Sequence, residues 1–357
     1  MPIHTLQSDN YTIEAGNIEE SSFSQLLNRF SDSKKVIIVD ENTHEYCLEF
    51  LITQFEELTD AEVMLLPAGE ENKVLEVSFQ VWEALSEYRV GRSDLIINLG
   101  GGVITDMGGF IASVFKRGVH FINIPTTLLA MVDASVGGKT GIDLGPYKNQ
   151  LGVFNTPDAV YIDKRFLSSL PESEWLNGYA EMLKHAIVFS KTHWKTIHAK
   201  TPSQITEEDI IESIAIKNQI VLADPKENGI RKLLNFGHTA GHAIEGYLLG
   251  TESPVPHGIA VAWGMSMEAE LAFKTGVLNE VDRAWIQSVL ASHFPPLPDF
   301  TPVKQELLSL MTNDKKNKSG KVSFVFPSEI GQADVNYSFD VDAPVLESLF
   351  FKSSDLY

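Results

Sequence analysis

The sequence is poor in cysteine, in long apolar runs and in basic residues, and each shortage excludes a class of protein. Cys47 is the single cysteine among 357 residues, which excludes an internal disulfide and suits a reducing cytoplasm. No apolar run approaches the roughly 20 residues that a membrane helix needs. The opening residues, MPIHTLQSDNYTIEAG, have neither the basic start nor the apolar stretch of a secretory signal. We therefore expect a cytoplasmic protein with no membrane partner.

Basic residues number 28 against 48 acidic ones, and the formal net charge is −20. An acidic surface repels nucleic acid at long range, so we expect no nucleic-acid partner. Solubility alone would explain the acidity. A local cluster of Lys and Arg would nevertheless indicate an anion site, because it opposes the overall charge.

The length of the chain fits two domains better than one. In the first half, short apolar runs alternate with amphipathic stretches such as Glu45–Glu57 and Val74–Tyr88. The apolar runs predict strands at Val36–Val39, Glu62–Leu66, Asp94–Leu99, His120–Ile124 and Ala159–Ile162. Apolar strands between helices indicate a parallel sheet covered on both faces. We predict an α/β domain over residues 1–170.

Helical periodicity dominates from about Pro171 onward. It predicts helices at Glu174–Phe189, Glu207–Leu222, His238–Leu249, Gly258–Lys274 and Asp282–His293. One late pair of apolar runs, Lys321–Phe326 and Asp334–Phe339, predicts a small hairpin. We predict a mainly α-helical domain over residues 171–357.

Two features of the first half are typical of a nucleotide site. Gly100–Gly102 follow a predicted strand in GGGVITD and lead into a helical stretch that contains Asp106. Glycine there lets backbone N–H groups approach a phosphate, and the helix N-terminus favours negative charge. Asp40 ends another predicted strand, where a carboxylate could accept from a ribose hydroxyl. A plain tight turn and a surface helix cap would explain the same residues, so both interpretations stay open.

The segment from Pro125 to Asn149, PTTLLAMVDASVGGKTGIDLGPYKN, is longer than an ordinary connection. It starts at the C-terminal end of a predicted strand, where ligands sit in open α/β sheets. Thr126 offers a hydroxyl, and Lys139 and Lys148 supply cations. Long ordered connections tend to be functional, and a purely structural role is the alternative.

Histidine and carboxylate recur on the predicted helices of the second half. RKLLNFGHTAGH spaces four polar residues by four, three and four positions, which would place them on one helix face: Arg231, Asn235, His238 and His242. His238 and His242 at i, i+4 could hold one metal ion, and His257 follows in VPHGIAVAWGM. A similar face in GYAEMLKHA carries Glu181, Lys184 and His185. Imidazole and carboxylate without thiolate suit zinc, and isolated structural histidines are the alternative.

These motifs together resemble the 3-dehydroquinate synthases, a family of sugar phosphate cyclases in the shikimate pathway. The likeness covers roughly Asp40 to Gly331. Its most specific parts are GGGVITD, VDASVGGKTGID with the KN at Lys148 and Asn149, GYAEMLKHA, and Arg231 with the LNFGHTAGHAIE that follows it. The resemblance implies a Rossmann-like NAD-binding α/β domain and a helical domain that binds metal and substrate. It implies a lyase that converts 3-deoxy-D-arabino-heptulosonate 7-phosphate into 3-dehydroquinate and phosphate. In that family the route is transient oxidation by NAD, phosphate elimination, re-reduction and an intramolecular aldol closure. The family is usually dimeric, so a homodimer is implied as well.

The resemblance also assigns site residues. It implies a metal, Zn2+ or Co2+, at Glu181, His238 and His257, which leaves His242 a catalytic or substrate-contacting role. The implied NAD contacts are Asp40, Asn42, Glu70, Lys73, Gly101, Gly102, Val103, Asp106, Thr126, Thr127, Leu129, Lys139, Lys148, Phe166 and Ser169. The implied substrate and catalytic positions are Arg117, Asp133, Lys139, Lys148, Asn149, Lys184, Lys217, Glu227, Arg231, Asn235 and His242. Either Lys315 or Lys316 should also reach the substrate, and the family's counterpart of Arg117 can reach a neighbouring subunit's site.

Two positions depart from the family pattern. The usual D-G-E-x-x-K is AGEENK here, with Ala68 in place of the acidic residue. A threonine usual near the domain boundary is Ser169, which keeps a hydroxyl. Both lie in the implied cofactor site, so they bear on the strength of the NAD contacts.

Three other functions fit parts of the same pattern. Relatives on the same fold make deoxy-inosose or valiolone products, but GGKTG, KN, Asn235 and His242 favour dehydroquinate synthase. A metal-dependent polyol dehydrogenase of the glycerol dehydrogenase type would not need so many cations, and it would convert free NAD+ into free NADH. A metal- and nucleotide-binding regulatory protein would not require Lys139, Lys148 and Arg231 to converge with the metal. We therefore predict a small anionic sugar phosphate as the substrate.

Overall fold

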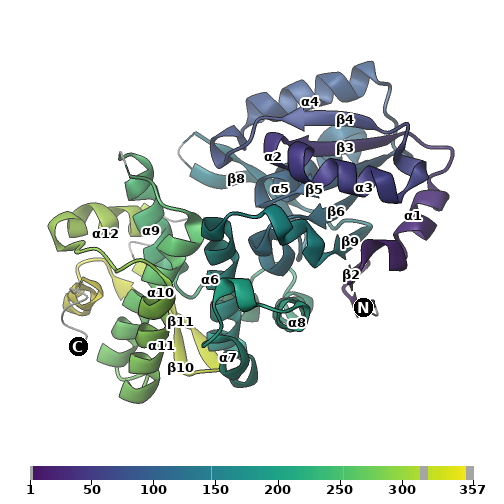
Figure 1. Cartoon of the computed structure of the whole chain (residues 1–357). Helices are drawn as coiled ribbons and strands as arrows, with labels where there is room; N and C mark the ends of the chain where they lie inside the picture. The colour runs from purple at the N-terminus through teal and green to yellow at the C-terminus, as the bar shows by residue number, and fades with distance from the viewer. Residues whose placement is uncertain (1–2, 146, 252, 314–320, 351–357) are drawn as a thin grey trace. The chain divides into compact units, whose positions relative to one another are not determined.

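The computed structural model describes residues 3–145, 147–251, 253–313 and 321–350 (Figure 1). The chain forms two compact units, Met1–Pro171 and Glu172–Tyr357, and the sequence placed the domain boundary after residue 170. In the described ranges, no helix has both the length and the apolar character that crossing a bilayer demands.

A mostly parallel sheet forms the centre of the first unit. Its strands run in the order β1 (His4–Gln7), β2 (Thr12–Ala15), β9 (Ala159–Ile162), β6 (His120–Pro125), β5 (Leu95–Gly100), β3 (Lys35–Asp40) and β4 (Glu62–Leu66). β1 and β2 pair antiparallel, and the other neighbours pair parallel. The predicted α/β class is confirmed, and every strand predicted from an apolar run is present. The sequence did not predict β1 and β2, which are short and carry no apolar run.

Burial explains why the central strands are apolar. Every residue of β5 is buried, and α4 (Leu75–Glu87) and α5 (Gly102–Val114) contribute apolar side chains to the same core cluster as β3 and β5. Because the strands are parallel, their carboxyl ends meet at one edge of the sheet. The register places Gly100 opposite Pro125 at that edge. The glycine turn and the segment after β6 are therefore neighbours.

The predicted helix Glu45–Glu57 is interrupted. The chain forms a short helical turn at Glu41–Thr43, a π-helical turn at His44–Leu48, the helix α3 at Glu49–Gln54 and a 3-10 turn at Glu56–Leu58. The helical periodicity of the sequence does not distinguish these turn types, because all of them bring residues three to five positions apart together.

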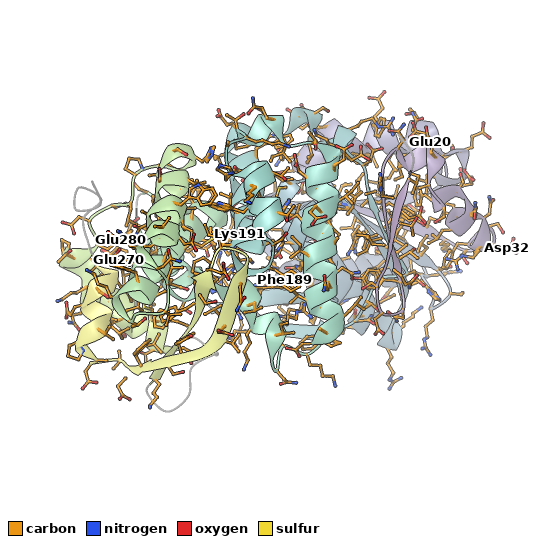
Figure 2. The ribbon with its side chains drawn as sticks, turned by 90° about the horizontal axis from the view of Figure 1, so that it is seen from below. Glu20, Asp32, Phe189, Lys191, Glu270 and Glu280 are labelled. Atoms are coloured by element: carbon orange, nitrogen blue, oxygen red, sulfur yellow. The ribbon has the colours of Figure 1, made fainter. Side chains whose placement is uncertain are left out.

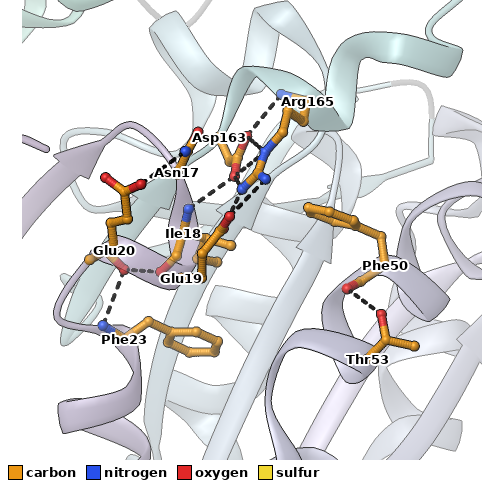
Figure 3. A network of polar contacts seen from close by, with 10 residues as sticks. Asn17, Ile18, Glu19, Glu20, Phe23, Phe50, Thr53, Asp163 and Arg165 are labelled. Carbon is orange, nitrogen blue, oxygen red and sulfur yellow. Dashed lines mark hydrogen bonds and ion pairs between the residues drawn. The ribbon is translucent and has the colours of Figure 1, made fainter. Parts of the chain in front are cut away.

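An ion-pair network holds the segment that follows β9 (Figure 3). The Arg165 guanidinium pairs with the carboxylates of Glu19 and Asp163. It also lies over the Phe50 ring, 4.9 Å from the ring centroid. These contacts anchor the 3-10 helix Lys164–Ser169, on which the family resemblance places two cofactor contacts.

One hairpin of the first unit corrects a sequence-based expectation. The sequence predicts one long connection from Pro125 to Asn149, and this is wrong. The chain instead passes through a π-helical turn at Ala130–Ala134 and then forms the antiparallel strands β7 (Lys139–Leu144) and β8 (Tyr147–Phe154). β7 packs on α5, which places Lys139 and Asn149 on a structured hairpin rather than on a loop.

Helices build most of the second unit. They are α6 (Glu172–Phe189), α7 (Lys191–Ile197), α8 (Glu207–Ala223), α9 (His238–Leu249), α10 (His257–Lys274), α11 (Glu280–His293) and α12 (Lys304–Asn313). α10 is buried along most of its length and packs against α6, α9 and α11. This agrees with the predicted mainly helical domain.

The predicted hairpin of the second unit is confirmed as β10 (Lys321–Glu329) and β11 (Gln332–Asp340). Figure 2 shows it beside the end of α6 at Phe189 and the start of α7 at Lys191. The Gly331 N–H in its turn donates to the Ile187 carbonyl at 2.8 Å, and Lys191 Nζ lies 3.4 Å from a Glu329 carboxylate oxygen. The turn of the hairpin is thus fixed to the helical core.

His193 on α7 makes the stability of the protein depend on pH. Its side chain is 2% exposed, and burial, with the nearby His185, lowers its pKa from 6.5 to about 4. Between these two pKa values the unfolded chain binds more protons, so this stabilisation is present above pH 6.5 and is lost as the pH falls toward 4. We expect His193→Gln to remove about 2–3 kcal/mol of the acid-induced loss in the free energy of unfolding.

Urea unfolding of the wild-type protein and of His193→Gln at pH 6.5, 5.5 and 4.5 measures this difference. His4→Gln, a change on the exposed strand β1, is the control and should follow the wild-type slope. A His193→Gln protein that loses stability with acid as steeply as the wild type would contradict the expectation.

Candidate functional site

The end of β5 forms a strand-to-helix turn without side chains. β5 ends at Gly100, and Gly101 is the N-cap of α5, with no side chain among the described residues capping the helix. A Cβ on Gly100 would lie 2.5 Å from the Ile104 Cβ, so the turn has no room for a side chain. The first turn of α5 presents backbone N–H groups at the positive end of a helix, an arrangement that binds phosphate. Val103 and Asp106 follow within α5.

The segment after β6 adds hydroxyl groups next to this turn. The Thr126 N–H donates to the Gly100 carbonyl at 3.0 Å. The Thr126 hydroxyl is buried and has no hydrogen-bond partner within the described part of the chain. The Thr127 hydroxyl accepts from the Ala130 N–H at 3.1 Å. A buried hydroxyl of this kind beside a phosphate-binding turn suits a polar ligand, since leaving it unpaired costs free energy.

Lys73 connects implied cofactor and substrate residues. Its side chain is buried, and Nζ lies 2.7 Å from an Asp106 carboxylate oxygen and 2.7 Å from the Asn149 amide oxygen. A second link joins Lys148 Nζ to Glu70 at 2.8 Å. The structure thus brings together the AGEENK segment, α5 and the β7–β8 hairpin.

Asp143 in β7 holds the backbone of Asn149. The Asp143 carboxylate accepts the Asn149 N–H at 2.6 Å, and its own N–H donates to the Lys73 carbonyl at 2.8 Å. Burial raises the pKa of Asp143 above its ordinary value, and the Asn149 N–H opposes this. Asn149 adopts a φ of 51°, in the left-handed region that non-glycine residues avoid. Such strain persists where the surroundings impose it, and it is frequent at functional sites.

Asp40 acts as a helix cap in this structure. Its Oδ1 accepts from the Thr43 N–H at 2.8 Å, and the Thr43 hydroxyl lies 3.0 Å from the same oxygen. The helix-cap role, which the sequence left open for Asp40, is therefore present in the structure. Asn42 lies in the same short helical turn. Phe166 packs edge-on against the Phe50 ring at 5.2 Å.

Imidazole and carboxylate groups meet in the second unit. Glu181 comes from α6, His238 and His242 from α9, and His257 from the first residue of α10. Glu181 is fully buried, and its Oε1 lies 3.5 Å from His238 Nε2 and 3.6 Å from His257 Nε2. Two ligands about 2.0–2.1 Å from one tetrahedral zinc ion lie roughly 3.4 Å apart. The two separations that involve Glu181 therefore match those of ligands around one ion.

Hydrogen bonds orient both imidazole rings toward Glu181. His238 Nδ1 lies 3.1 Å from the Phe236 carbonyl, and His257 Nδ1 lies 3.1 Å from a Glu245 carboxylate oxygen. A carbonyl or carboxylate on one ring nitrogen directs the other nitrogen to a metal and fixes its tautomer. Lys184, one turn after Glu181, forms a buried ion pair with its other oxygen.

The surroundings of the two histidines shift their pKa values in opposite directions. Burial, helped by the charge of Lys184, lowers the pKa of His238 well below its usual value. Burial also disfavours the charged form of His257, but Glu245 and Glu181 outweigh it and raise the pKa of His257 to about 10. A divalent cation would replace that proton, because metal ligation requires neutral imidazole.

A second set of possible ligands overlaps with the first. The ligand atoms of His238, His242 and His257 all lie within 4.8 Å of one another. The His238 and His242 rings are 5.0 Å apart between centroids. The i, i+4 pair considered from the sequence thus exists, beside the set that includes Glu181.

The single helix face expected for Arg231, Asn235, His238 and His242 is wrong. Arg231 and Asn235 lie on a separate 3-10 helix, Ile230–Asn235. Gly237, with a φ of 78°, turns the chain before α9 begins at His238. His185, predicted on the Glu181 face, lies 2.8 Å from the Ser213 hydroxyl of α8 through Nδ1.

The loop before this 3-10 helix is built around Asp224. Its carboxylate accepts from the backbone N–H groups of Asn228, Gly229 and Arg231, at 2.9, 2.6 and 3.1 Å. The loop brings Glu227 to the Asn235 side chain, at 2.7 Å. The buried Arg231 donates from Nη1 to the Pro225 carbonyl at 2.7 Å.

Backbone strain coincides with implied substrate positions. Among the described residues, positive φ outside glycine occurs at Arg89, Lys116, Arg117, Asn149 and Glu227. Arg117, Asn149 and Glu227 are three of the positions that the resemblance assigns to substrate. The remaining assigned positions include Asp133 in the π-helical turn, the exposed Lys139 in β7 and the buried Lys217 in α8. Lys315 and Lys316 lie outside the described residues.

The sequence did not predict three further carboxylates of the second unit, Glu245, Asp224 and Glu268. Glu245 follows His238 by seven positions on α9, so helical spacing alone would have placed it on the histidine face. Asp224 binds backbone N–H groups of its own loop and Glu268 binds those at the start of α9, and no spacing rule in the sequence predicts such contacts.

Comparison with known proteins identifies relatives along nearly the whole chain. Sequence profiles of the 3-dehydroquinate synthase N-terminal and C-terminal domains match residues 63–177 and 178–317. A 3-dehydroquinate synthase of Parabacteroides distasonis is 39% identical over 336 residues, which are 93% of this chain and 95% of that protein.

Solved structures share the fold. A 2-deoxy-scyllo-inosose synthase complexed with carbaglucose-6-phosphate, NAD+ and Co2+ has a TM-score of 0.84 at 22% identity, over 97% of this chain and 99% of that chain. The 2-epi-5-epi-valiolone synthase of Streptomyces hygroscopicus subsp. jinggangensis, with NAD+ and Zn2+ bound, has a TM-score of 0.81 at 24% identity, over 98% of both chains. At these identities the likeness shows the fold alone.

Proposed function

The chain belongs to the 3-dehydroquinate synthase family, and on that premise we propose that it converts 3-deoxy-D-arabino-heptulosonate 7-phosphate into 3-dehydroquinate and phosphate. The observation that carries the proposal is the 39% identity to a 3-dehydroquinate synthase across 93% of the chain. The proposal includes a cytoplasmic homodimer. The single cysteine supports a location in the reducing cytoplasm. The dimer is supported by the family, whose members are usually dimeric.

The proposal assigns the metal, Zn2+ or Co2+, to Glu181, His238 and His257. The separations of Glu181 from the two imidazoles and the contacts on both Nδ1 atoms support this set. A bound ion would polarise substrate oxygens as a Lewis acid. His242 would then contact substrate, next to the ion.

The proposal assigns NAD+ to the first unit. The N-terminus of α5 suits the diphosphate, and the Thr126 hydroxyl suits a polar group of the cofactor. Oδ1 of Asp40 caps Thr43, so a ribose hydroxyl would bind Oδ2. Bound NAD+ would supply a transient oxidation of a substrate alcohol. The other assigned contacts are Asn42, Glu70, Lys73, Gly101, Gly102, Val103, Asp106, Thr127, Leu129, Lys139, Lys148, Phe166 and Ser169.

The proposal assigns the substrate's phosphate and carboxylate to cations that oppose the net charge of −20. They are Arg117, Lys139, Lys148, Lys184, Lys217 and Arg231. Local positive charge in an acidic protein concentrates a small anion at the site. Asp133, Asn149, Glu227, Asn235 and His242 would orient its hydroxyl groups.

A second candidate is another sugar phosphate cyclase, which the TM-scores of 0.84 and 0.81 favour at the level of fold. Phosphate release separates the candidates. The purified protein is incubated with NAD+, Zn2+ and one sugar phosphate at a time. Release from 3-deoxy-D-arabino-heptulosonate 7-phosphate alone would support the proposal, and release from a glucose phosphate or a heptulose phosphate without the carboxylate would favour the second candidate.

NAD+ should be required but not consumed, because the oxidised carbon is reduced again before product leaves. We expect steady-state turnover to release phosphate with no growing absorbance from free NADH. Phosphate and NADH are followed in the same reaction. NADH that accumulates in proportion to phosphate would instead indicate a dehydrogenase.

A further inference from the structure

A buried carboxylate from α10 binds the start of α9. Glu268 is fully buried, and its Oε2 accepts from the Gly237 N–H at 2.8 Å while its Oε1 accepts from the Ala240 N–H at 3.0 Å. α9 has no side-chain cap of its own, since its N-cap is Gly237. Glu268 therefore supplies from a neighbouring helix the acceptors that an N-cap side chain would supply.

The two helices meet at this point with little space between their backbones. A Cβ on Gly264 of α10 would lie 2.0 Å from the Gly237 carbonyl oxygen. Gly237 itself has a φ of 78°, which a residue with a side chain rarely adopts. Close approach and the paired hydrogen bonds of Glu268 together determine where the first turn of α9 lies.

That first turn carries a proposed metal ligand. His238 is the first residue of α9, and its Nδ1 lies 3.1 Å from the Phe236 carbonyl, just before the turn. The N–H groups that Glu268 binds belong to residues on both sides of His238. Movement of the turn would therefore displace the imidazole relative to Glu181, which lies on another helix.

We propose that Glu268 is a positioning residue of the metal centre, whose carboxylate holds the first turn of α9 and thereby aims His238 at the ion. This inference rests on the proposed function, because it takes Glu181, His238 and His257 as the ligands. A carboxylate at a helix N-terminus interacts favourably with the helix dipole, and both of its oxygens are needed for the two N–H groups. A metal site weakens when the groups that orient its ligands are lost.

Glu268→Gln tests the role, because the amide replaces one of the two acceptor oxygens with an NH2 group, which cannot accept from a backbone N–H. The apoprotein, prepared with a chelator, is titrated with Co2+, and binding is followed by calorimetry and by the visible absorption of bound Co2+. We expect Co2+ affinity to fall roughly 10-fold to 100-fold and the visible spectrum to change.

Glu270→Gln is the matched control. Glu270 follows Glu268 by two residues on α10. It is also buried, and its carboxylate pairs with Arg283 at 3.1 Å. Its substitution removes a buried carboxylate from the same helix without touching α9, so Co2+ affinity and spectrum should remain those of the wild type. Thermal unfolding of both apoproteins shows whether the two variants are destabilised to a similar degree.

The outcomes separate the inference from the proposed function. If the wild-type protein bound no Co2+, the proposed metal site itself would be wrong. Wild-type protein that binds Co2+, with Glu268→Gln matching it in affinity and spectrum, would overturn the positioning role alone. An equal loss in Glu268→Gln and Glu270→Gln would also overturn it, because general destabilisation would then suffice. If Glu268→Gln fails to fold, Glu268→Asp replaces it: weaker Co2+ binding supports the role, and unchanged binding overturns it.

Discussion

His257→Ala is expected to lose its metal and to lower kcat/KM by about 100-fold to 10,000-fold. Zinc binding in small protein sites contributes about 10–16 kcal/mol, so one ligand of the set accounts for roughly 3–5 kcal/mol. Loss of His257 would also remove an imidazole nitrogen that lies 3.1 Å from the buried Glu245 carboxylate. Bound zinc is measured by elemental analysis after dialysis, beside phosphate release.

Two further variants decide between the overlapping ligand sets. Glu181→Gln should lose metal as His257→Ala does, because Glu181 Oε1 lies 3.5 and 3.6 Å from the two imidazole nitrogens. His242→Ala should keep stoichiometric metal and lose turnover. Loss of metal in His242→Ala with retention in Glu181→Gln would establish the three-histidine site instead. Full activity with stoichiometric zinc in His257→Ala would falsify both sets.

The wild-type protein provides the reference for this comparison. Chelation should abolish phosphate release, and added zinc or cobalt should restore it in the wild type. His293→Ala is the control for loss of an imidazole in the second unit, because His293 contacts the His198 carbonyl and is not one of the proposed metal ligands. It should bind zinc as the wild type does.

The core of the fold could be predicted because its residues are uniform. β3 and β5 are nearly continuous apolar runs, since parallel strands are covered on both faces. The helices of the second unit show a clear 3.6-residue period. By contrast, β7 and β8 mix glycine, charge and polar residues in KTGIDL and YKNQLGVF, so neither alternation nor an apolar run marks them.

The site was only partly predictable, for a related reason. Spacing on one helix correctly placed His238 and His242 close together. It could not show that Glu181 lies beside them, because Glu181 belongs to α6, far earlier in the chain. The break at Gly237 was hidden because polar residues on both sides of it keep helical spacing. Which side chains share a metal depends on how α6, α9 and α10 pack, and the sequence pattern of each helix records only which face is buried.

Arg231→Met is expected to lower kcat/KM by roughly 30-fold to several thousand-fold, and Arg231→Lys should recover only part of the lost activity. Arg231 is 3% exposed, and its backbone is held by Asp224 while Nη1 donates to the Pro225 carbonyl. An ammonium group keeps the charge but not the planar fork that binds a carboxylate or phosphate through two hydrogen bonds. Removing one member of a buried charge pair costs about 2–5 kcal/mol. Lys139→Met should lose activity by a similar mechanism.

The affinities for NAD+ and Zn2+ show whether the loss arises at the substrate. Arg231→Lys should bind both as the wild type does, since Arg231 belongs to neither assigned set. Lys232→Met is the neighbouring control: it removes a cation from the same 3-10 helix and should leave kcat/KM near the wild-type value. If Arg231→Lys and Lys139→Met both kept wild-type kcat/KM, these cations would not bind the substrate, and its anionic groups would have to bind elsewhere. A loss in Arg231→Lys that came with weaker Zn2+ binding would place the effect at the metal centre, because the 3-10 helix of Arg231 ends just before Phe236, whose carbonyl orients His238.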